Sequence, residues 1–195
     1  MIRPLLSKVC RSEYYISSDI SPTNQTTLVC DSLQLPFDNK TLDLIAAFEV
    51  MEHIHDTKKF FSEIVRVLKP DGYVVISAPF IYGKHDFQDY YRWTEQGLDT
   101  VLKTYGFSRC LMRPRGGTFF SINSLIQNYL ITLLSSRSEK WRSHNLGKNF
   151  FLGVMQILMS PLVISSWFFL GLDTLIDHNS SNPSGFVCIA KKNKK

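Results

Sequence analysis

The chain has 195 residues, of which 44% are hydrophobic and 20% are charged, which predicts one globular domain and excludes a mainly disordered protein. Its four cysteines stand apart, which argues against a disulfide scaffold and a zinc module, so no metal site is expected. Much of the net charge of +5 comes from lysines at the C-terminus, and the remaining excess does not indicate a nucleic-acid partner. The N-terminal residues lack the apolar core of a secretory signal, so a cytoplasmic protein is expected.

The first part of the chain predicts two short strands, each of which ends beside an aspartate. The strand 14–20 (YYISSDI) contains Asp19 near its end, and the strand 26–30 (TTLVC) is followed by Asp31. Residues 21–24 (SPTN) have the composition of a turn. Each strand therefore delivers a carboxylate to the loop that follows it.

A buried strand, a helix and a further strand come next. Residues 42–50 (LDLIAAFEV) are nearly all apolar, as in a strand covered on both faces. Asp56 is the expected N-cap of a helix whose apolar residues recur at helical spacing over 60–68. The sequence Pro-Asp-Gly at 70–72 ends that helix, and residues 73–78 (YVVISA) predict another buried strand.

The remaining core elements are one helix and two strands. Thr94 is the expected cap of a helix that ends at Gly106, and residues 107–112 (FSRCLM) and 186–190 (FVCIA) are the strands. Alternating apolar strands and helices predict an α/β fold with a doubly wound, mostly parallel sheet.

This pattern divides the chain into a core and an insertion. Residues 1–112 and 185–195 are expected to form the α/β core, and residues 113–184 a mostly helical, hydrophobic insertion. Ligands on such sheets bind at the carboxyl ends of the strands. A carboxylate there can accept hydrogen bonds from a ribose diol or from the exocyclic amine of adenine. A single strand-end aspartate is explained as well by a turn or a helix cap, so only the combination is informative.

Four stretches together carry a family resemblance. The order SDIS, CDSLQLPF, LDLIAAFEVMEHIHD and EIVRVLKPDGYVVISAPF resembles the Rossmann-like (class I) S-adenosylmethionine-dependent methyltransferases, in particular the branch that acts on small molecules. The resemblance covers residues 1–112 and the last strand. It implies S-adenosyl-L-methionine as the cofactor and methyl transfer to a small-molecule, lipid or glycan acceptor.

The resemblance also assigns residues to the cofactor. Asp19 matches the acid that binds the ribose, and Asp31, with Ser32 beside it, matches the acid that binds the adenine. The apolar neighbours Ile20 and Leu33 are expected to cover the two faces of the base. Phe48 and Glu49 match the strand end that approaches the methionine part of the cofactor.

One family feature is missing from these residues. The family's first strand ends in a glycine-rich loop, usually GxGxG, and this sequence contains no such motif. MIRPLLSK resembles the helix that follows that loop, so we expect a chain that is N-terminally truncated and a sheet without its first strand. The alternative function is a degenerate, non-catalytic domain that acts through its hydrophobic insertion.

The loop KHDFQDYYRW at 84–93 resembles the family's HDYYRxT stretch, which lies over the transferred methyl group. His85 is the best candidate for the base that deprotonates an acceptor, because the pKa of an imidazole lies near neutral pH. Asp86 and His53 are the other candidates for this base. The structural alternative for His53 is a residue that satisfies local backbone groups at the start of the following helix.

Three residues at the end of this loop, Tyr90, Tyr91 and Arg92, are expected to contact the substrate. An alternative remains open for Tyr91 and Arg92, which could instead pin the loop by packing and by an ion pair with Asp86 or Asp89.

The insertion is unusually apolar. Residues 119–134 have helical spacing, and residues 150–172 contain no charge. A single membrane crossing is excluded because the strand 186–190 must return to the sheet, and Pro161 interrupts the run. One remaining explanation is a buried or homodimer-forming helical pair. The other is a hairpin at a membrane surface, flanked by four basic residues, Arg137, Lys140, Arg142 and Lys148.

Overall fold

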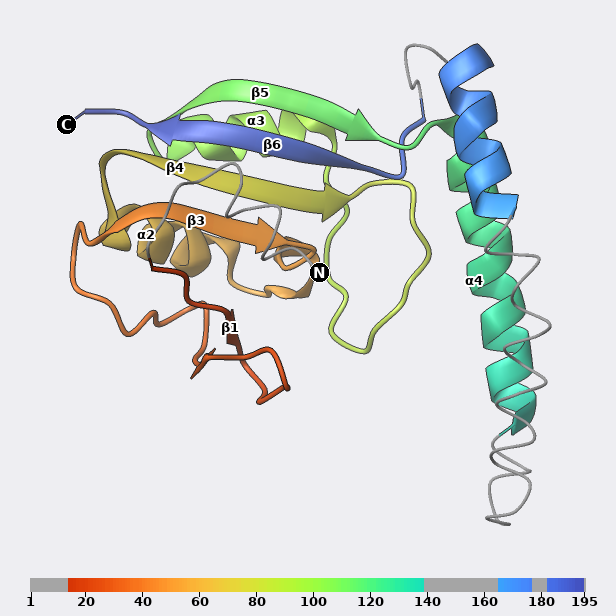
Figure 1. Cartoon of the computed structure of the whole chain (residues 1–195), viewed down its shortest axis with the longest axis horizontal. Coiled ribbons are helices and arrows are strands. Elements are labelled where there is room, and N and C mark those ends of the chain that lie inside the picture. The colour runs from red at the N-terminus through yellow and green to blue at the C-terminus, as the bar shows by residue number, and fades with distance from the viewer. Residues whose placement is uncertain (1–13, 139–164, 177–181, 195) are drawn as a thin grey trace.

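The computed structural model describes residues 14–138, 165–176 and 182–194. A sheet backed by helices forms its main body, and a helical arm stands beside one edge of that sheet (Figure 1). The elements are β1 (Ser18–Asp19), β2 (Leu28–Val29), β3 (Leu42–Phe48), the 3-10 helix η1 (Met51–His53), α2 (Thr57–Val67), β4 (Leu68–Pro79), α3 (Glu95–Thr104), β5 (Phe107–Arg115), α4 (Thr118–Ser138) and β6 (Gly185–Lys192). Residues 165–176 are also helical.

The main sheet has four strands in the order β3-β4-β6-β5. β3 and β4 are parallel, whereas β6 is antiparallel to both of its neighbours, β4 and β5. The predicted α/β fold is confirmed, and the sheet is mixed because the last strand enters in the opposite direction. The carboxyl ends of β3, β4 and β5 therefore share one edge of the sheet, where β6 begins (Figure 1).

β1 and β2 form a separate parallel pair, with Asp19 beside Val29 in register. Both strands are shorter than the predicted ranges 14–20 and 26–30. The strands are short because they are not buried. Ser18, Asp19 and Val29 are exposed, so little side-chain packing stabilises a longer pair. Because the pair is parallel, both strands still end at the same side, as the prediction of a shared binding edge requires.

Helices α2 and α3 lie on the same face of the main sheet (Figure 1). Asp56 caps α2 as predicted, since its carboxylate accepts a hydrogen bond from the Lys59 backbone N–H at 3.0 Å. Thr94 caps α3 in the same way through the Gly97 N–H at 3.0 Å. Apolar spacing and a capping side chain are local signals, and both helices begin where these signals place them.

The start of β4 differs from the prediction. We expected Leu68 to end the helix and residues 73–78 to form the strand, but α2 stops at Val67 and β4 begins at Leu68. Leu68 pairs with Leu42, and the regular register resumes only at Tyr73 opposite Leu44. The predicted turn residues lie within this irregularity, where Asp71 has a positive φ of 65°.

The core is a single cluster of apolar side chains from α2, α3 and the strands, and it includes Cys188 of β6. Burial raises the pKa of the Cys188 thiol to about 11, whereas Cys110 of β5 is exposed.

We expect iodoacetamide at mildly alkaline pH to alkylate Cys110 in the native protein and to leave Cys188 unmodified until denaturant is added. Peptide mass spectrometry measures both sites, and equal rates in the native protein would contradict this packing.

The helical arm consists of α4 and residues 165–176, which contact each other. Asp173 from the second segment is buried and accepts hydrogen bonds from the backbone N–H groups of Gly117 at 2.9 Å, Phe119 at 2.8 Å and Phe120 at 2.9 Å. It therefore caps the start of α4 from another helix. Gly117 is required here because a Cβ atom would lie only 2.6 Å from the Asp173 carboxyl carbon.

Polar side chains fill the space between the two helices of the arm. Asn123 is 4% exposed; its Oδ1 accepts from Ser165 Oγ at 3.0 Å, and its Nδ2 donates to Ser166 Oγ at 3.2 Å. Gln127 donates to the same Ser166 hydroxyl at 2.8 Å. Large apolar side chains are instead exposed, namely Ile122, Leu125, Ile126, Tyr129, Trp167, Phe168, Leu175 and Ile176. This distribution is the reverse of that in a water-soluble helix pair.

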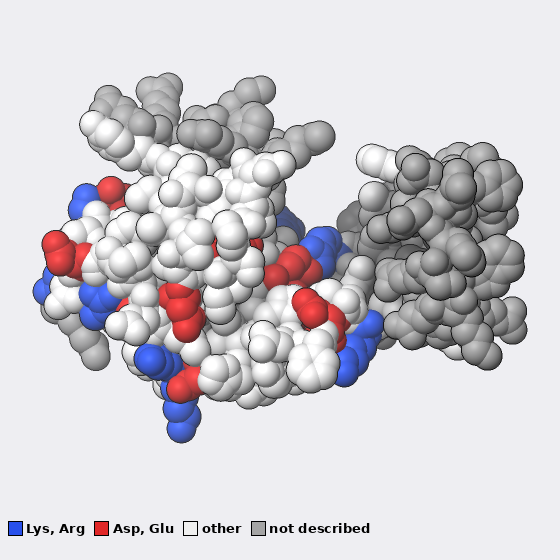
Figure 2. Space-filling view, turned by 90° about the horizontal axis from the view of Figure 1, so that it is seen from below, with Lys and Arg blue, Asp and Glu red and all other residues white. Residues whose placement is uncertain are grey.

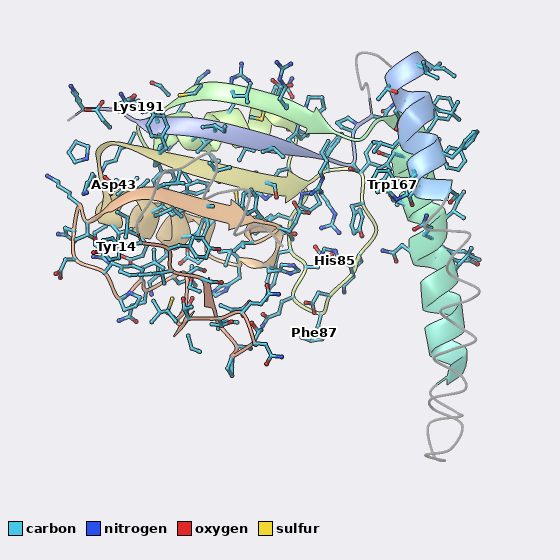
Figure 3. All side chains as sticks on the ribbon, viewed as in Figure 1. Tyr14, Asp43, His85, Phe87, Trp167 and Lys191 are labelled. Carbon is cyan, nitrogen blue, oxygen red and sulfur yellow. The ribbon has the colours of Figure 1, made fainter. Side chains whose placement is uncertain are left out.

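Part of the predicted apolar stretch 150–172 lies outside the described residues, which resume at 165. Within the three described ranges, no helix has the length and apolar character needed to cross a membrane. Trp167 lies on the exposed surface of the arm, where it is 74% accessible (Figure 3).

Candidate active site

Asp19 and Asp31 lie at the same end of the β1–β2 pair, since the Asp19 carbonyl accepts from the backbone N–H of Cys30 at 3.0 Å. Each carboxylate accepts from a backbone N–H two residues ahead, that of Ser21 at 2.9 Å and that of Leu33 at 2.8 Å. Both side chains are exposed, and neither forms an ion pair with any residue in the described ranges. Each carboxylate therefore keeps oxygen lone pairs that a ligand's hydroxyl or amine can use.

The neighbours of these aspartates differ in exposure. Ile20 is 71% exposed and can cover a flat ligand, and Ser32 is half-buried. Leu33 is 9% exposed and belongs to the core cluster, so its side chain supports the loop from inside. The contact of Leu33 with an adenine base stays a prediction.

Glu49 connects the ends of three strands. It follows β3 with a positive φ of 52°, and its carboxylate accepts from Ser77 Oγ of β4 at 2.6 Å. Arg115 of β5 binds both carboxylate oxygens, at 3.0 and 2.9 Å. A cofactor amine would have to share Glu49 with this guanidinium, so its observed role is to join the strand ends. Phe48, the preceding residue, is half-buried.

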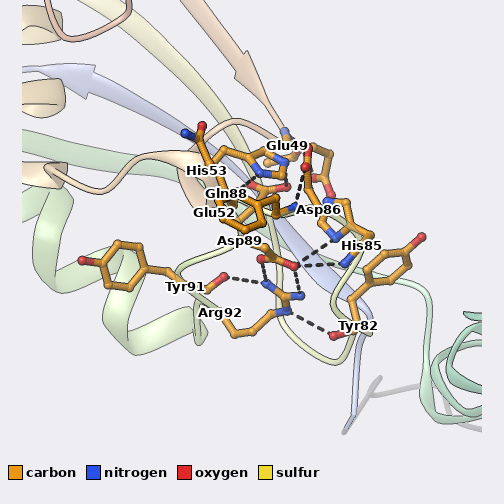
Figure 4. A network of polar contacts seen from close by, with 12 residues as sticks. Glu49, Glu52, His53, Tyr82, His85, Asp86, Gln88, Asp89, Tyr91 and Arg92 are labelled. Carbon is orange, nitrogen blue, oxygen red and sulfur yellow. Dashed lines mark hydrogen bonds and ion pairs between the residues drawn. The ribbon is translucent and has the colours of Figure 1, made fainter. Parts of the chain in front are cut away.

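Arg92 organises the loop between β4 and α3, and Figure 4 shows its contacts. Its guanidinium forms an ion pair with Asp89 through both terminal nitrogens and also donates to the carbonyls of Tyr82, Gly83 and Tyr91. These bonds use all five guanidinium N–H donors. The structure thus favours the alternative in which Arg92 pins the loop, and the contact of Arg92 with substrate stays a prediction.

Asp89 links Arg92 to His85. The hydrogen bonds from Arg92 lower the pKa of the Asp89 carboxyl to about 2, so this group is ionised at neutral pH. One of its oxygens accepts from the His85 backbone N–H at 3.2 Å and lies 3.3 Å from His85 Nδ1. This contact favours the tautomer with the proton on Nδ1 and leaves a lone pair on Nε2. His85 lies in the loop beyond the carboxyl edge of the sheet (Figure 3).

Tyr90 and Tyr91 present partly exposed rings beside this loop, with 50% and 40% of their surfaces accessible. The Tyr91 hydroxyl donates to the His55 carbonyl at 3.3 Å, and the Tyr90 backbone N–H donates to the Glu52 carbonyl at 2.7 Å. Both residues thereby attach the loop to η1. Their contact with substrate stays a prediction.

Glu52, which belongs to the Glu-His pair of the EVMEHIHD stretch, is a buried carboxylate to which the sequence assigned no role. Its side chain is fully buried, and neither of its oxygens has a hydrogen-bond partner among the described residues. Burial raises the pKa of this carboxyl group above its usual value. Its neighbours are the rings of His53 and His85, and ligand atoms of the three residues lie within 4.8 Å of one another. The sequence feature that could have predicted this cluster is an adjacent Glu-His pair after one strand, with a second histidine in the loop after the next strand.

The arm borders the loop that carries His85. Asn128 of α4 donates to the Lys84 carbonyl at 3.4 Å. Gly83 lies so close to Asn128 that a Cβ atom there would be 2.6 Å from its side chain. The exposed apolar helices and the candidate catalytic loop are therefore in direct contact.

Residues 5–76 match a family model described as a methyltransferase domain. The match covers less than half of the chain, and over these residues the chain is similar to methyltransferase domains. The matched segment contains Asp19, Asp31, Glu49 and the Glu52-His53 pair. The loop with His85 and the helical arm lie beyond it, so these features are argued from the structure alone.

Two curated relatives show how far the similarity extends. The chain is 33% identical over 81 residues to tocopherol O-methyltransferase of Arabidopsis thaliana, an alignment that covers 40% of this chain and 22% of that protein. It is 27% identical over 140 residues to tRNA (carboxymethyluridine(34)-5-O)-methyltransferase of Arabidopsis thaliana, an alignment that covers 65% of this chain and 33% of that protein. The chain thus spans a third or less of either relative.

One solved structure supports the fold. The crystal structure of the [4+2]-cyclase SpnF superposes with a TM-score of 0.50 at 15% sequence identity, over 85% of this chain and 55% of that chain. At this identity the likeness shows the architecture and says nothing of the reaction.

Proposed function

We propose that this protein uses S-adenosyl-L-methionine to methylate a small-molecule, lipid or glycan acceptor. The observation that carries the proposal is the pair of exposed carboxylates, Asp19 and Asp31, at one end of two parallel strands within the segment that matches the family. A ribose diol and an adenine amine are neutral donors, and ionised carboxylates that lack a cationic partner are suited to accept from them.

The chain's own residues would hold the cofactor by these groups. Asp19 would accept from the ribose hydroxyls, Asp31 would accept from the adenine amine, and Ile20 would cover the base. When bound, the cofactor would supply an electrophilic methyl group for transfer to the acceptor.

His85 would act as the general base for a hydroxyl acceptor. Its Nε2 would take the hydroxyl proton, and the neighbouring Asp89 carboxylate would stabilise the imidazolium that results. Arg92 keeps Asp89 ionised and fixes its position, so we assign Asp89 and Arg92 as positioning residues.

The charges of the site favour an acceptor that is not a polyanion. The guanidinium of Arg92 is committed to Asp89, and that of Arg115 to Glu49. Acidic and basic residues are interspersed on the face shown in Figure 2 and form no broad basic patch there. A nucleic-acid site needs cations that are free to contact phosphates. These observations support a small acceptor over an RNA such as the one named for the tRNA-modifying relative.

Isothermal titration calorimetry with S-adenosylhomocysteine tests the cofactor half of this proposal. We expect saturable one-to-one binding to the chain of 195 residues. Micromolar affinity would show that the carboxylate pair suffices without a glycine-rich loop. Absence of binding in a protein whose circular dichroism shows it folded would favour the non-catalytic alternative.

We further propose that the arm attaches the protein to an anionic membrane surface. Its exposed apolar side chains and its buried polar interface match helix pairs in lipid, where polar groups hold helices together. The sequence at the end of α4 and after it carries four basic residues that complement anionic headgroups, Arg137, Lys140, Arg142 and Lys148. Contact between Asn128 and the His85 loop would place the reaction beside that surface.

Liposome flotation of the full chain tests this attachment. We expect the protein to float with vesicles that contain phosphatidylserine and to float less with phosphatidylcholine alone, because the basic residues contribute to binding. Recovery in the soluble fraction with both vesicles would refute it.

A further inference from the structure

Two histidines and a glutamate converge behind the candidate base, and we propose that Glu52, His53 and His85 bind one divalent transition-metal ion. Each residue offers one ligand atom, and these atoms all lie within 4.8 Å of one another. His53 Nε2 is 3.7 Å from a Glu52 carboxylate oxygen. The two imidazole rings meet edge to face, with their centroids 5.1 Å apart (Figure 4).

The buried glutamate is the first independent observation. Glu52 is fully buried, and neither carboxylate oxygen has a hydrogen-bond partner within the described ranges. A buried polar group without a partner destabilises the folded protein, and a charged one does so more strongly. A cation at the cluster would remove this cost by coordinating the carboxylate.

The second observation is the support behind both rings. His53 Nδ1 lies 2.5 Å from the Gln88 carbonyl oxygen, and His85 Nδ1 lies 3.3 Å from the Asp89 carboxylate. Histidines that bind metals usually donate their other ring N–H to a carbonyl or a carboxylate, which fixes the tautomer. Both rings are held in this way, so the Nε2 lone pairs are the ones left for a ligand.

The donor set indicates the class of ion. Two imidazole nitrogens and one carboxylate suit Zn²⁺, Co²⁺ or Ni²⁺, whereas Mg²⁺ and Ca²⁺ prefer oxygen ligands alone. Zinc–ligand bonds of about 2.0–2.2 Å require ligand atoms closer together than those observed. His85 is exposed and Glu52 is fully buried, so we expect the His85 side chain to make most of the adjustment on binding.

The ion would affect the proposed reaction, so this inference partly rests on the proposed function. A bound ion would take the Nε2 lone pair that His85 needs as a base. Binding of the ion and base catalysis by His85 are therefore mutually exclusive, and the ion is expected to inhibit methyl transfer.

Titration of the full chain with Co²⁺ tests the site without cofactor or acceptor. We expect one ion per chain, with visible absorption bands of coordinated Co²⁺ that added Zn²⁺ abolishes. His53→Asn, His85→Asn and Glu52→Gln should each weaken binding at least about tenfold, and Asp89→Asn about tenfold through the His85 ring. His55→Asn is the matched control, because this exposed histidine lies outside the cluster, and it should bind Co²⁺ like the unaltered protein.

The outcomes separate this inference from the proposed function. Absence of stoichiometric binding to the unaltered protein, or equal binding by the three ligand variants, overturns the metal site and leaves the binding of S-adenosylhomocysteine as a separate measurement. If the Glu52→Gln variant does not fold, the His85→Asn variant still tests the site, because His85 lies in an exposed loop and its replacement should not affect folding. Methyl transfer that rises when Zn²⁺ is added would uphold the site and refute His85 as the base.

Discussion

Asp19→Ala and Asp31→Ala should each weaken binding of S-adenosylhomocysteine by about 100-fold in calorimetric titrations. A hydrogen bond to a charged group contributes about 1.5–3 kcal/mol, and about 2.7 kcal/mol corresponds to a 100-fold change in affinity. Neither carboxylate has an ion-pair partner in the described ranges that could compete for it, so this free energy is available to the ligand.

The design of these variants must separate ligand binding from loop structure. Both aspartates also accept a backbone N–H two residues ahead, a bond that asparagine can keep. Asp19→Asn and Asp31→Asn should therefore preserve the turns and give a smaller loss of affinity than the alanine variants. Asp38→Ala removes an exposed carboxylate from the loop after Asp31 and should leave the affinity unchanged. Equal affinity for all five variants would refute the assigned cofactor site.

Replacement of Trp167 and Phe168 by serine should move most of the protein from the vesicle fraction to the soluble fraction in flotation experiments. The two side chains are 74% and 64% exposed on the arm, so the free protein should lose little packing. Moving each aromatic ring from lipid to water costs about 2–3 kcal/mol, so the two substitutions together should lower partitioning into vesicles by about 1,000-fold or more. Tyr73→Ser is the matched control, since Tyr73 is 42% exposed on the core sheet and should not affect flotation.

A second copy of the chain is the other occupant of the apolar faces. Light scattering after size-exclusion chromatography would then report a dimer in the absence of lipid, and the same two serine substitutions would convert it to a monomer. A lipid-independent dimer that does not float would replace the membrane proposal by a protein interface.

Local signals in the sequence were sufficient for the helices, whereas pairing between distant segments decided the strands. Asp56 and Thr94 marked the starts of α2 and α3 because a cap acts within one turn. The start of β4 depends on which residue of β3 stands opposite Leu68, and no pattern near Leu68 encodes that register.

The candidate site was predictable in part for the same reason. Asp19 and Asp31 could be placed together because parallel strands end at one edge. The burial of Glu52 beside His85 could not be predicted, because it depends on how the loop after β4 folds back over η1. The sequence did not predict that every N–H donor of Arg92 would be used within the protein. Several of these donors bind backbone carbonyls, which any residue can supply, so no residue type marks them.

The cap that Asp173 places on α4 makes the two helices of the arm one mechanical unit. Excision of the second helix would leave three backbone donors at the start of α4 without their acceptor. A displacement of the second helix would be transmitted through Asp173 to the backbone at Gly117. Arg115, which forms an ion pair with Glu49, lies two residues before Gly117. A partner that binds the arm would therefore be coupled, through Gly117 and Arg115, to the strand ends where the reaction is proposed to occur.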